Sequence, residues 1–158
     1  MMLRADLTLY ALSFASILSG CSTDSTNAAP RTLNDCVVGW WVSPSSPCST
    51  ATGMEEASAA DCRSAAFTNY SADGSLTAGV YSYSASRGTM SGVFGRSTYV
   101  VVSGAVQVRP GSHLAQAICT STELALDGQS QTRAPAGIAA LLEKGTAQGG
   151  TSFASVPQ

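Results

Sequence analysis

The side chains that could take part in catalysis are few and lie far apart along the chain. His113 is the single histidine, and no Gly-x-Ser-x-Gly nucleophile motif accompanies it, because Gly-Thr-Met-Ser-Gly at 88–92 has the wrong spacing. Glu55, Glu56 and Asp61 could supply the paired carboxylates of a glycosidase. They fall in one short segment without a second acidic cluster, so a solvated helix explains them better. The sequence therefore predicts a protein that is not an enzyme and uses no cofactor.

The amino-terminal segment offers a different chemistry, at a cysteine. An apolar run at 7–18 is shorter than the ~20 residues of a membrane-spanning helix and is typical of a signal peptide. It ends in Leu18, Ser19, Gly20 and Cys21: a branched apolar residue, two small residues and a cysteine. This motif resembles the lipobox of bacterial lipoproteins. The resemblance implies removal of residues 1–20 as a signal peptide and attachment of a diacylglyceryl group to the Cys21 sulfur.

The same resemblance bears on location. Similar lipoproteins of two-membrane bacteria stay at the inner membrane mainly when an aspartate follows the lipidated cysteine, and here Ser22 follows it. We expect an exported protein that is lipid-anchored at the outer membrane, on either its periplasmic or its surface side. Residues 21–35, small, polar and aperiodic after the cysteine, would form a flexible tether. An ordinary signal peptide with a chance cysteine is the alternative.

Four further cysteines predict cross-links in the folded part of the chain: Cys36, Cys48, Cys62 and Cys119. An even number in an exported chain of this size indicates two disulfides, for which three pairings are possible. We predict Cys48–Cys62, which would close a loop rich in Ser, Pro and Thr, and consequently Cys36–Cys119. A metal site is the alternative, but no two of these cysteines have the C-x₂₋₄-C spacing of zinc ligands.

The elements that must position these residues are mostly strands, because apolar and polar residues alternate with a period of two. Turn sequences recur about every 8–12 residues, as in a meander. They lie at 73–74, 86–88, 109–112 and 127–128. Residues 99–108 are predicted as one strand, with Gly104 marking a bulge.

Two segments break the alternation. Residues 54–63 have the composition of a helix, with acidic residues near its start. A second helix is predicted after Pro135, with Ile138, Leu141 and Leu142 on one face and Gly145 as its C-cap. The folded domain would then cover 36–144, followed by a disordered tail at 145–158.

Several short motifs of the domain resemble the small lipocalin-like β-barrel domains of bacterial lipoproteins. Gly39 and Trp41 fit a Gly-x-Trp first strand, an aromatic hairpin surrounds Asp73-Gly74, and Leu-x-Leu at 124–126 fits a closing strand. The resemblance implies a mainly β fold: an antiparallel meander that forms a small lipocalin-like barrel or half-barrel, with one or two short helices. About seven strands are recognisable, and a barrel that small can be filled by its own side chains.

Aromatic residues are the candidates for a binding surface. Trp40 and Trp41 must point to opposite faces of their strand. Tyr81 and Tyr83 share one face of another strand, and they would be exposed if Val80, on the other face, pointed into the core. Exposed tyrosine pairs are common at binding surfaces, although tyrosines that simply cover a solvated sheet face are the alternative.

Composition limits the remaining classes of function. The chain has 158 residues, of which 11% are charged, and a net charge of −2. No basic patch is present, which argues against nucleic acid as a partner. We expect a lipid-anchored, non-enzymatic envelope protein whose barrel binds a small apolar ligand. The alternative is a structural or protein-interaction lipoprotein, such as an envelope assembly partner or a protease inhibitor, with a filled barrel.

Overall fold

The computed structural model describes residues 32–48 and 61–157. The predicted helix at 54–63 lies largely outside these residues, and its last part is wrong, because Cys62 begins a strand. The helices are α1 (Leu33–Val37) and α2 (Ala136–Ala147). The strands are β1 (Gly39–Val42), β2 (Ser46–Pro47), β3 (Cys62–Tyr70), β4 (Ser75–Ser84), β5 (Thr89–Val102), β6 (Ala105–Arg109), β7 (Leu114–Cys119), β8 (Glu123–Leu126), β9 (Gln129–Arg133) and β10 (Ser152–Pro157).

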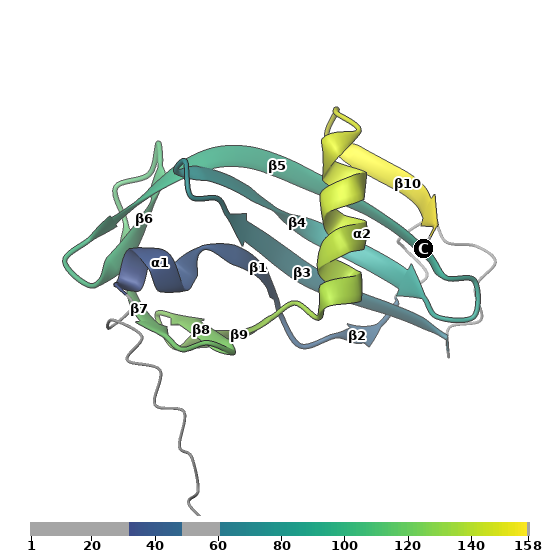
Figure 1. The fold of residues 1–158 in the computed structure, drawn as a ribbon, viewed down its shortest axis with the longest axis horizontal. Coiled ribbons are helices and arrows are strands. Elements are labelled where there is room, and N and C mark those ends of the chain that lie inside the picture. Colours follow the sequence, from purple (N-terminus) through teal and green to yellow (C-terminus); the bar gives the residue numbers. More distant parts are fainter. Residues whose placement is uncertain (1–31, 49–60, 158) are drawn as a thin grey trace, which may run out of the picture.

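The strands form one antiparallel meander that closes on itself. Consecutive strands from β3 to β9 pair in order, and β1 pairs with both β9 and β3. The path β1–β9–β8–β7–β6–β5–β4–β3 is therefore a ring, with β2 beside β3 and β10 beside β5. This arrangement (Figure 1) confirms the predicted fold class, a mainly β antiparallel barrel with two short helices.

Tight turns explain why the strands pair with their neighbours in sequence. Gly74 adopts a φ of 84° between β3 and β4, and Asp73 accepts a hydrogen bond of 2.9 Å from the Ser75 N–H. The predicted single strand at 99–108 is wrong. Ser103 and Gly104 both have positive φ, 49° and 83°, which is the requirement of a two-residue hairpin turn rather than a bulge, so this segment is the β5–β6 hairpin.

The inner surface of the ring, which we call the barrel face, is packed with side chains. Its fully buried members include Trp41, Leu124 and Val37, each 0% exposed. The other buried members of this core are Tyr70, Leu76, Tyr99 and Val106. These side chains therefore fill the middle of the barrel.

The opposite surface of β3, β4 and β5, which we call the helix face, carries a second core. Phe67, Tyr81 and Phe94 lie on this face and pack beneath Leu141 and Leu142 of α2. Figure 1 shows α2 crossing these strands with β10 beside it. Neither described helix is long and apolar enough to span a bilayer.

The carboxyl-terminal tail is ordered over most of its length, contrary to the prediction for 145–158. Helix α2 continues past Gly145 to Ala147, and β10 pairs with β5. Gly145 is not a C-cap: a Cβ there would lie 2.7 Å from the Phe153 ring. The residue is glycine because β10 needs this close approach to the helix.

The last part of the predicted tether is also ordered. Residues 32–35 belong to α1, whose start is fixed by a capping box. The Thr32 hydroxyl accepts from the Asp35 N–H at 3.2 Å, and the Asp35 carboxylate accepts from the Thr32 N–H at 3.3 Å. Val37, the last residue of α1, enters the barrel core. The folded domain therefore already includes residues 32–35, before the predicted boundary at Cys36.

Candidate functional site

The described cysteines form both predicted disulfides. Cys36–Cys119 joins α1 to the end of β7 with a Cα–Cα distance of 6.0 Å. Cys48–Cys62 joins the end of β2 to the start of β3 at 5.4 Å. The pairings are confirmed, whereas the lipobox residues Leu18, Ser19, Gly20 and Cys21 lie outside the described residues.

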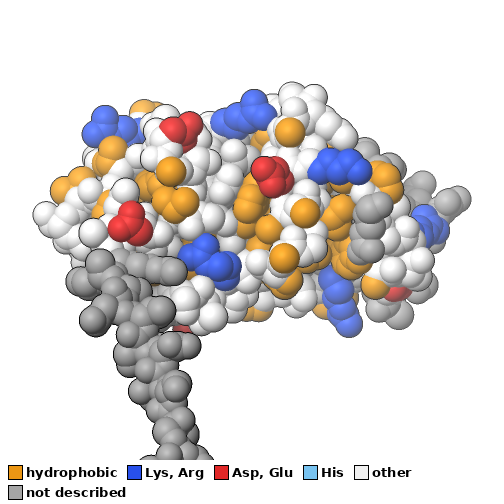
Figure 2. Space-filling model, in the orientation of Figure 1, with side chains coloured by type: hydrophobic (Ala, Val, Ile, Leu, Met, Phe, Trp, Pro, Cys, Tyr) orange, Lys and Arg blue, Asp and Glu red, His pale blue; other side chains and the backbone are white. Residues whose placement is uncertain are grey.

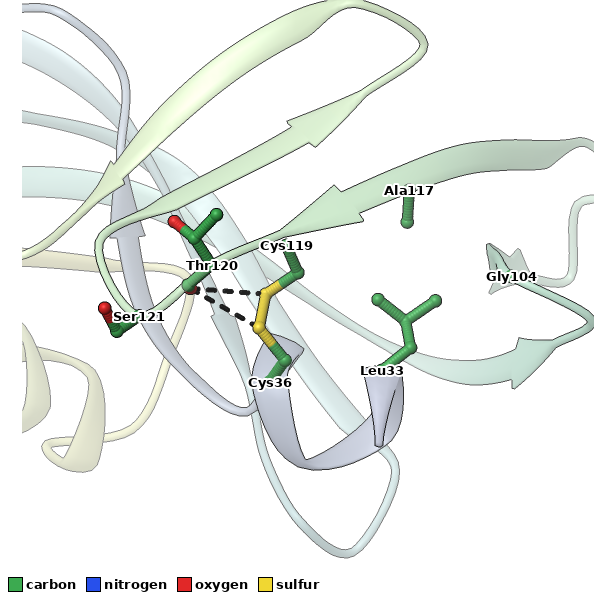
Figure 3. Close-up of a pocket in the computed structure, with 7 residues that line it drawn as sticks. All are labelled: Leu33, Cys36, Gly104, Ala117, Cys119, Thr120 and Ser121. Carbon is green, nitrogen blue, oxygen red and sulfur yellow. Dashed lines mark hydrogen bonds between the residues drawn. A yellow bond between two sulfur atoms is a disulfide. The ribbon is translucent and has the colours of Figure 1, made fainter. Parts of the chain in front are cut away.

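A groove lies beside the Cys36–Cys119 disulfide, between α1 and the barrel (Figure 3). Its volume is about 560 Å³, and Leu33 and Ala117 give it apolar walls. The Thr120 carbonyl oxygen lies 3.4 Å from the Cys36 sulfur. The groove is open to solvent, and its described lining residues offer apolar contacts rather than titratable side chains, which suits an apolar group.

Trp41 and Arg133 close the ring where β1 meets β9. The Arg133 guanidinium carbon lies 4.1 Å from the centroid of the Trp41 ring, within the range of a cation–π interaction. The same guanidinium donates to the carbonyls of Val38 (3.0 Å), Cys36 (2.9 Å) and, through Nε, Ser121 (3.0 Å). One side chain thus holds α1, β1 and the β7–β8 turn together.

The Gly-x-Trp element of the first strand now has a physical explanation. Gly39 has a φ of 129°, and a Cβ there would overlap Nη1 of Arg133. The Trp41 indole N–H donates to the Val37 carbonyl at 2.7 Å, which satisfies the polar atom of a buried ring. These residues therefore serve the closure of the barrel, and Trp41, which is fully buried, is inaccessible as a binding surface.

The predicted exposure of the tyrosines is wrong. Tyr81 is buried on the helix face, Tyr83 is half-buried beside it, and Val80 is 50% exposed. Trp40 is half-buried on the same face, with its ring centroid 5.8 Å from that of Phe67. The structure thus brings Trp40, Tyr81 and Tyr83 to one face, where α2 covers them, and places Trp41 on the other.

Burial affects the phenols of this protein. Desolvation, and to a lesser degree the neighbouring Tyr99, raises the pKa of Tyr70 to about 12. Desolvation also raises the pKa of Tyr81. Both phenols are therefore neutral members of the two cores at physiological pH.

His113 finds an acidic partner at the surface. Its Nε2 lies 2.6 Å from Oδ2 of Asp127, and both side chains are exposed, by 79% and 45%. The hydrogen bond from His113, with a second from the Gln116 N–H, holds the pKa of Asp127 below its usual value. The pair joins the β6–β7 turn to the β8–β9 turn, on an exposed surface rather than in a cleft.

Asp61 makes the densest side-chain hydrogen-bond cluster among the described residues. It accepts from the Ser84 hydroxyl at 2.7 Å and from the hydroxyl and the N–H of Ser86. These bonds, Ser86 first, lower the pKa of its carboxyl. Asp61 therefore fixes the β4–β5 turn to the start of β3, and its predicted partners Glu55 and Glu56 lie outside the described residues.

Charged side chains are dispersed rather than gathered. On the face that Figure 2 shows, Lys, Arg, Asp and Glu lie scattered among uncharged residues. Within 32–48 and 61–157, no three His, Cys, Asp or Glu side chains lie close enough to hold a metal ion.

Sequence reasoning missed Arg133 and Gln131. Both belong to β9, whose residues Gln-Ser-Gln-Thr-Arg are all polar, so no alternation marks them as a strand. Gln131 pairs with Leu124 on the barrel face, and its Oε1 is buried without a hydrogen-bond partner among the described residues. The signal available in the sequence was an arginine two residues before Pro135, at the end of an otherwise uncharged segment.

Comparison of the chain with family models, curated proteins and solved structures found no match.

Proposed function

We propose that the chain is a lipid-anchored, non-enzymatic protein of the bacterial envelope that acts through contacts at its outer surface. The observation that carries this proposal is the filled barrel: Trp41, Leu124 and Val106 occupy the space that a ligand would need. The lipobox-like motif that ends at Cys21 supports the anchor. The two disulfides support an oxidising compartment outside the cytoplasm.

Binding of a small ligand inside the barrel is the second candidate. The buried Gln131 Oε1 favours it, since an acceptor on the barrel face without a protein donor could receive a hydrogen bond from a hydroxyl of an otherwise apolar molecule. The packing of the same core favours the first candidate over this one.

One experiment tests the anchor and the ligand together. The full chain would be expressed in a two-membrane bacterium, extracted from the envelope in mild detergent, and weighed both natively and after denaturation. We expect a chain that begins at Cys21 with a diacylglyceryl group on its sulfur, carries two disulfides, and has the same mass in both states. A soluble chain without lipid contradicts the anchor. A small molecule that is lost on denaturation contradicts surface action alone, and the variant Gln131→Leu should then lose that molecule.

A further inference from the structure

We propose that the outer wall formed by β6–β9, together with the end of β5, lies against the surface of the lipid bilayer. This inference rests on the proposed lipid anchor at Cys21 and specifies what the anchored domain contacts. It begins with the exposed apolar residues of this wall. Ile118 is 74% exposed, Leu114 45% and Val102 43%.

The strand register places these three side chains on the outside of the ring. Leu114 lies opposite Gln107, and Ile118 opposite Ala125. Their neighbours in sequence, Ala115 and Ala117, are opposite Val106 and Leu126 on the barrel face. The wall is therefore a continuous surface made from the outward residues of adjacent strands.

The charged side chains of this wall lie only at the ends of its strands, among the described residues. Arg109 ends β6, Glu123 begins β8 and Asp127 follows β8. Its other outward polar side chains are uncharged, namely Gln107, Gln116, Ser130 and Thr132. An apolar surface with an uncharged middle can enter the headgroup region of a bilayer there without the large cost of desolvating an ion. A surface exposed only to water would be more soluble with charged residues here.

The covalent path from the anchor leads to the same wall. The described chain starts at Thr32, about 11 residues after Cys21, a span of at most ~40 Å however those residues are arranged. From Thr32 the path is rigid, because the Cys36–Cys119 disulfide fixes α1 to the residue that follows Ile118. A lipid on Cys21 would thus keep Ile118 within reach of the membrane, which raises its effective concentration there.

The acidic residues near this end decide which lipid suits the wall. Glu123 faces outward at the start of β8, at one end of the wall, and Asp35 lies on α1. An anionic bilayer would repel both side chains. The contact should therefore form best on a zwitterionic surface such as phosphatidylcholine with phosphatidylethanolamine.

Tryptophan placed on the wall tests this contact directly. Ile118→Trp and Leu114→Trp replace exposed residues on the wall, and Val80→Trp is the matched control, since Val80 is 50% exposed on a strand across the ring. Each full-length lipidated variant would be reconstituted into zwitterionic vesicles that contain acyl chains brominated near the headgroup. We expect the added emission of both wall variants to fall at least twofold more than that of the control. Circular dichroism would verify the fold of each variant.

The outcomes separate this inference from the proposed function. A chain that carries lipid and floats with the vesicles, but shows equal quenching in all three variants, overturns the wall contact and leaves the anchor intact. Dimers cross-linked through the wall, with low quenching, would assign the wall to a second copy of the chain and also overturn the contact. A chain without lipid, which does not float, refutes the proposed function and this inference together.

Discussion

Replacement of Arg133 by methionine should destabilise the domain more than any other single change of a charged residue described here. The substitution keeps the aliphatic stem but removes the donors to the carbonyls of Val38, Cys36 and Ser121 and the contact with Trp41. Each hydrogen bond from a charged donor contributes about 1.5–3 kcal/mol, and a partly desolvated cation–π contact about 1–2 kcal/mol. The carbonyl of Ser121 is exposed and regains water, so we expect a net loss of about 3–5 kcal/mol.

The assay is equilibrium unfolding in urea with both disulfides intact, followed by circular dichroism. Arg109→Met is the matched control, because Arg109 is exposed at the end of β6 and such surface changes cost less than about 0.5 kcal/mol. A double-mutant cycle with Trp41→Phe should show a coupling of about 1 kcal/mol between the two side chains. A loss for Arg133→Met that equals the loss for the control would refute the role of this guanidinium in closing the ring.

Three further predictions concern stability. Gly145→Ala should lower the free energy of unfolding, measured by thermal unfolding, by about 1–3 kcal/mol, because its methyl group would press on the Phe153 ring. Gly137→Ala, in open space on the same helix, should raise it by about 0.5–1 kcal/mol. Equal effects of the two variants would contradict this explanation. Tyr70 should lower the free energy of unfolding by about 2–3 kcal/mol between pH 10 and 12, because unfolded tyrosine releases its proton near pH 10 and folded Tyr70 near 12. Tyr70→Phe should lessen the fall by this amount, and Tyr81, whose pKa burial also raises, should maintain a smaller fall. Replacing both cysteines of Cys36–Cys119 by alanine should lower the free energy of unfolding in urea by about 1.5 kcal/mol more than the same change in Cys48–Cys62, since the enclosed loops differ in sequence separation, 83 against 14. The reverse order would count against loop entropy as the cause.

The meander and the disulfides could be predicted because their causes are local or few. Asp73-Gly74 and Asp127-Gly128 are turn sequences whose backbone requirements hold in almost any context. Four cysteines allow only three pairings, and Cys48–Cys62, which brackets a loop rich in Ser, Pro and Thr, was one of the two formed. The second helix was also predicted, because its apolar residues share one face.

Which side chains of each strand are buried could not be predicted, because the buried face changes along a strand. Leu76 is buried on the barrel face, whereas Tyr81, farther along β4, is buried on the helix face. Alternation that starts from Leu76 therefore places Val80 inside and Tyr81 outside, the reverse of what the structure shows. The cause is α2, which covers one part of the sheet and not the other, and this contact is invisible in the local pattern.

The ordering of the carboxyl terminus has a similar origin. The sequence from Ser152 to Pro157 is short and unremarkable by itself, and it becomes a strand because β5 is long enough to pair with β4 on one side and with both β6 and β10 on the other. Arg133 was not predicted as an important residue, because it closes the ring, and ring closure depends on the topology of the strands rather than on the spacing of residues in the sequence.

The two cores share β3, β4 and β5, and this sharing determines how the domain unfolds. The barrel face and the helix face are opposite sides of the same strands. Loss of either core therefore leaves these strands packed on one side only. The region under α2 is consequently no separable module: deletion of residues after Pro135 would expose Phe67, Tyr81 and Phe94 on strands that the barrel still needs. The chain should therefore unfold in one cooperative transition, and a fragment that ends before α2 should aggregate rather than survive as a smaller barrel.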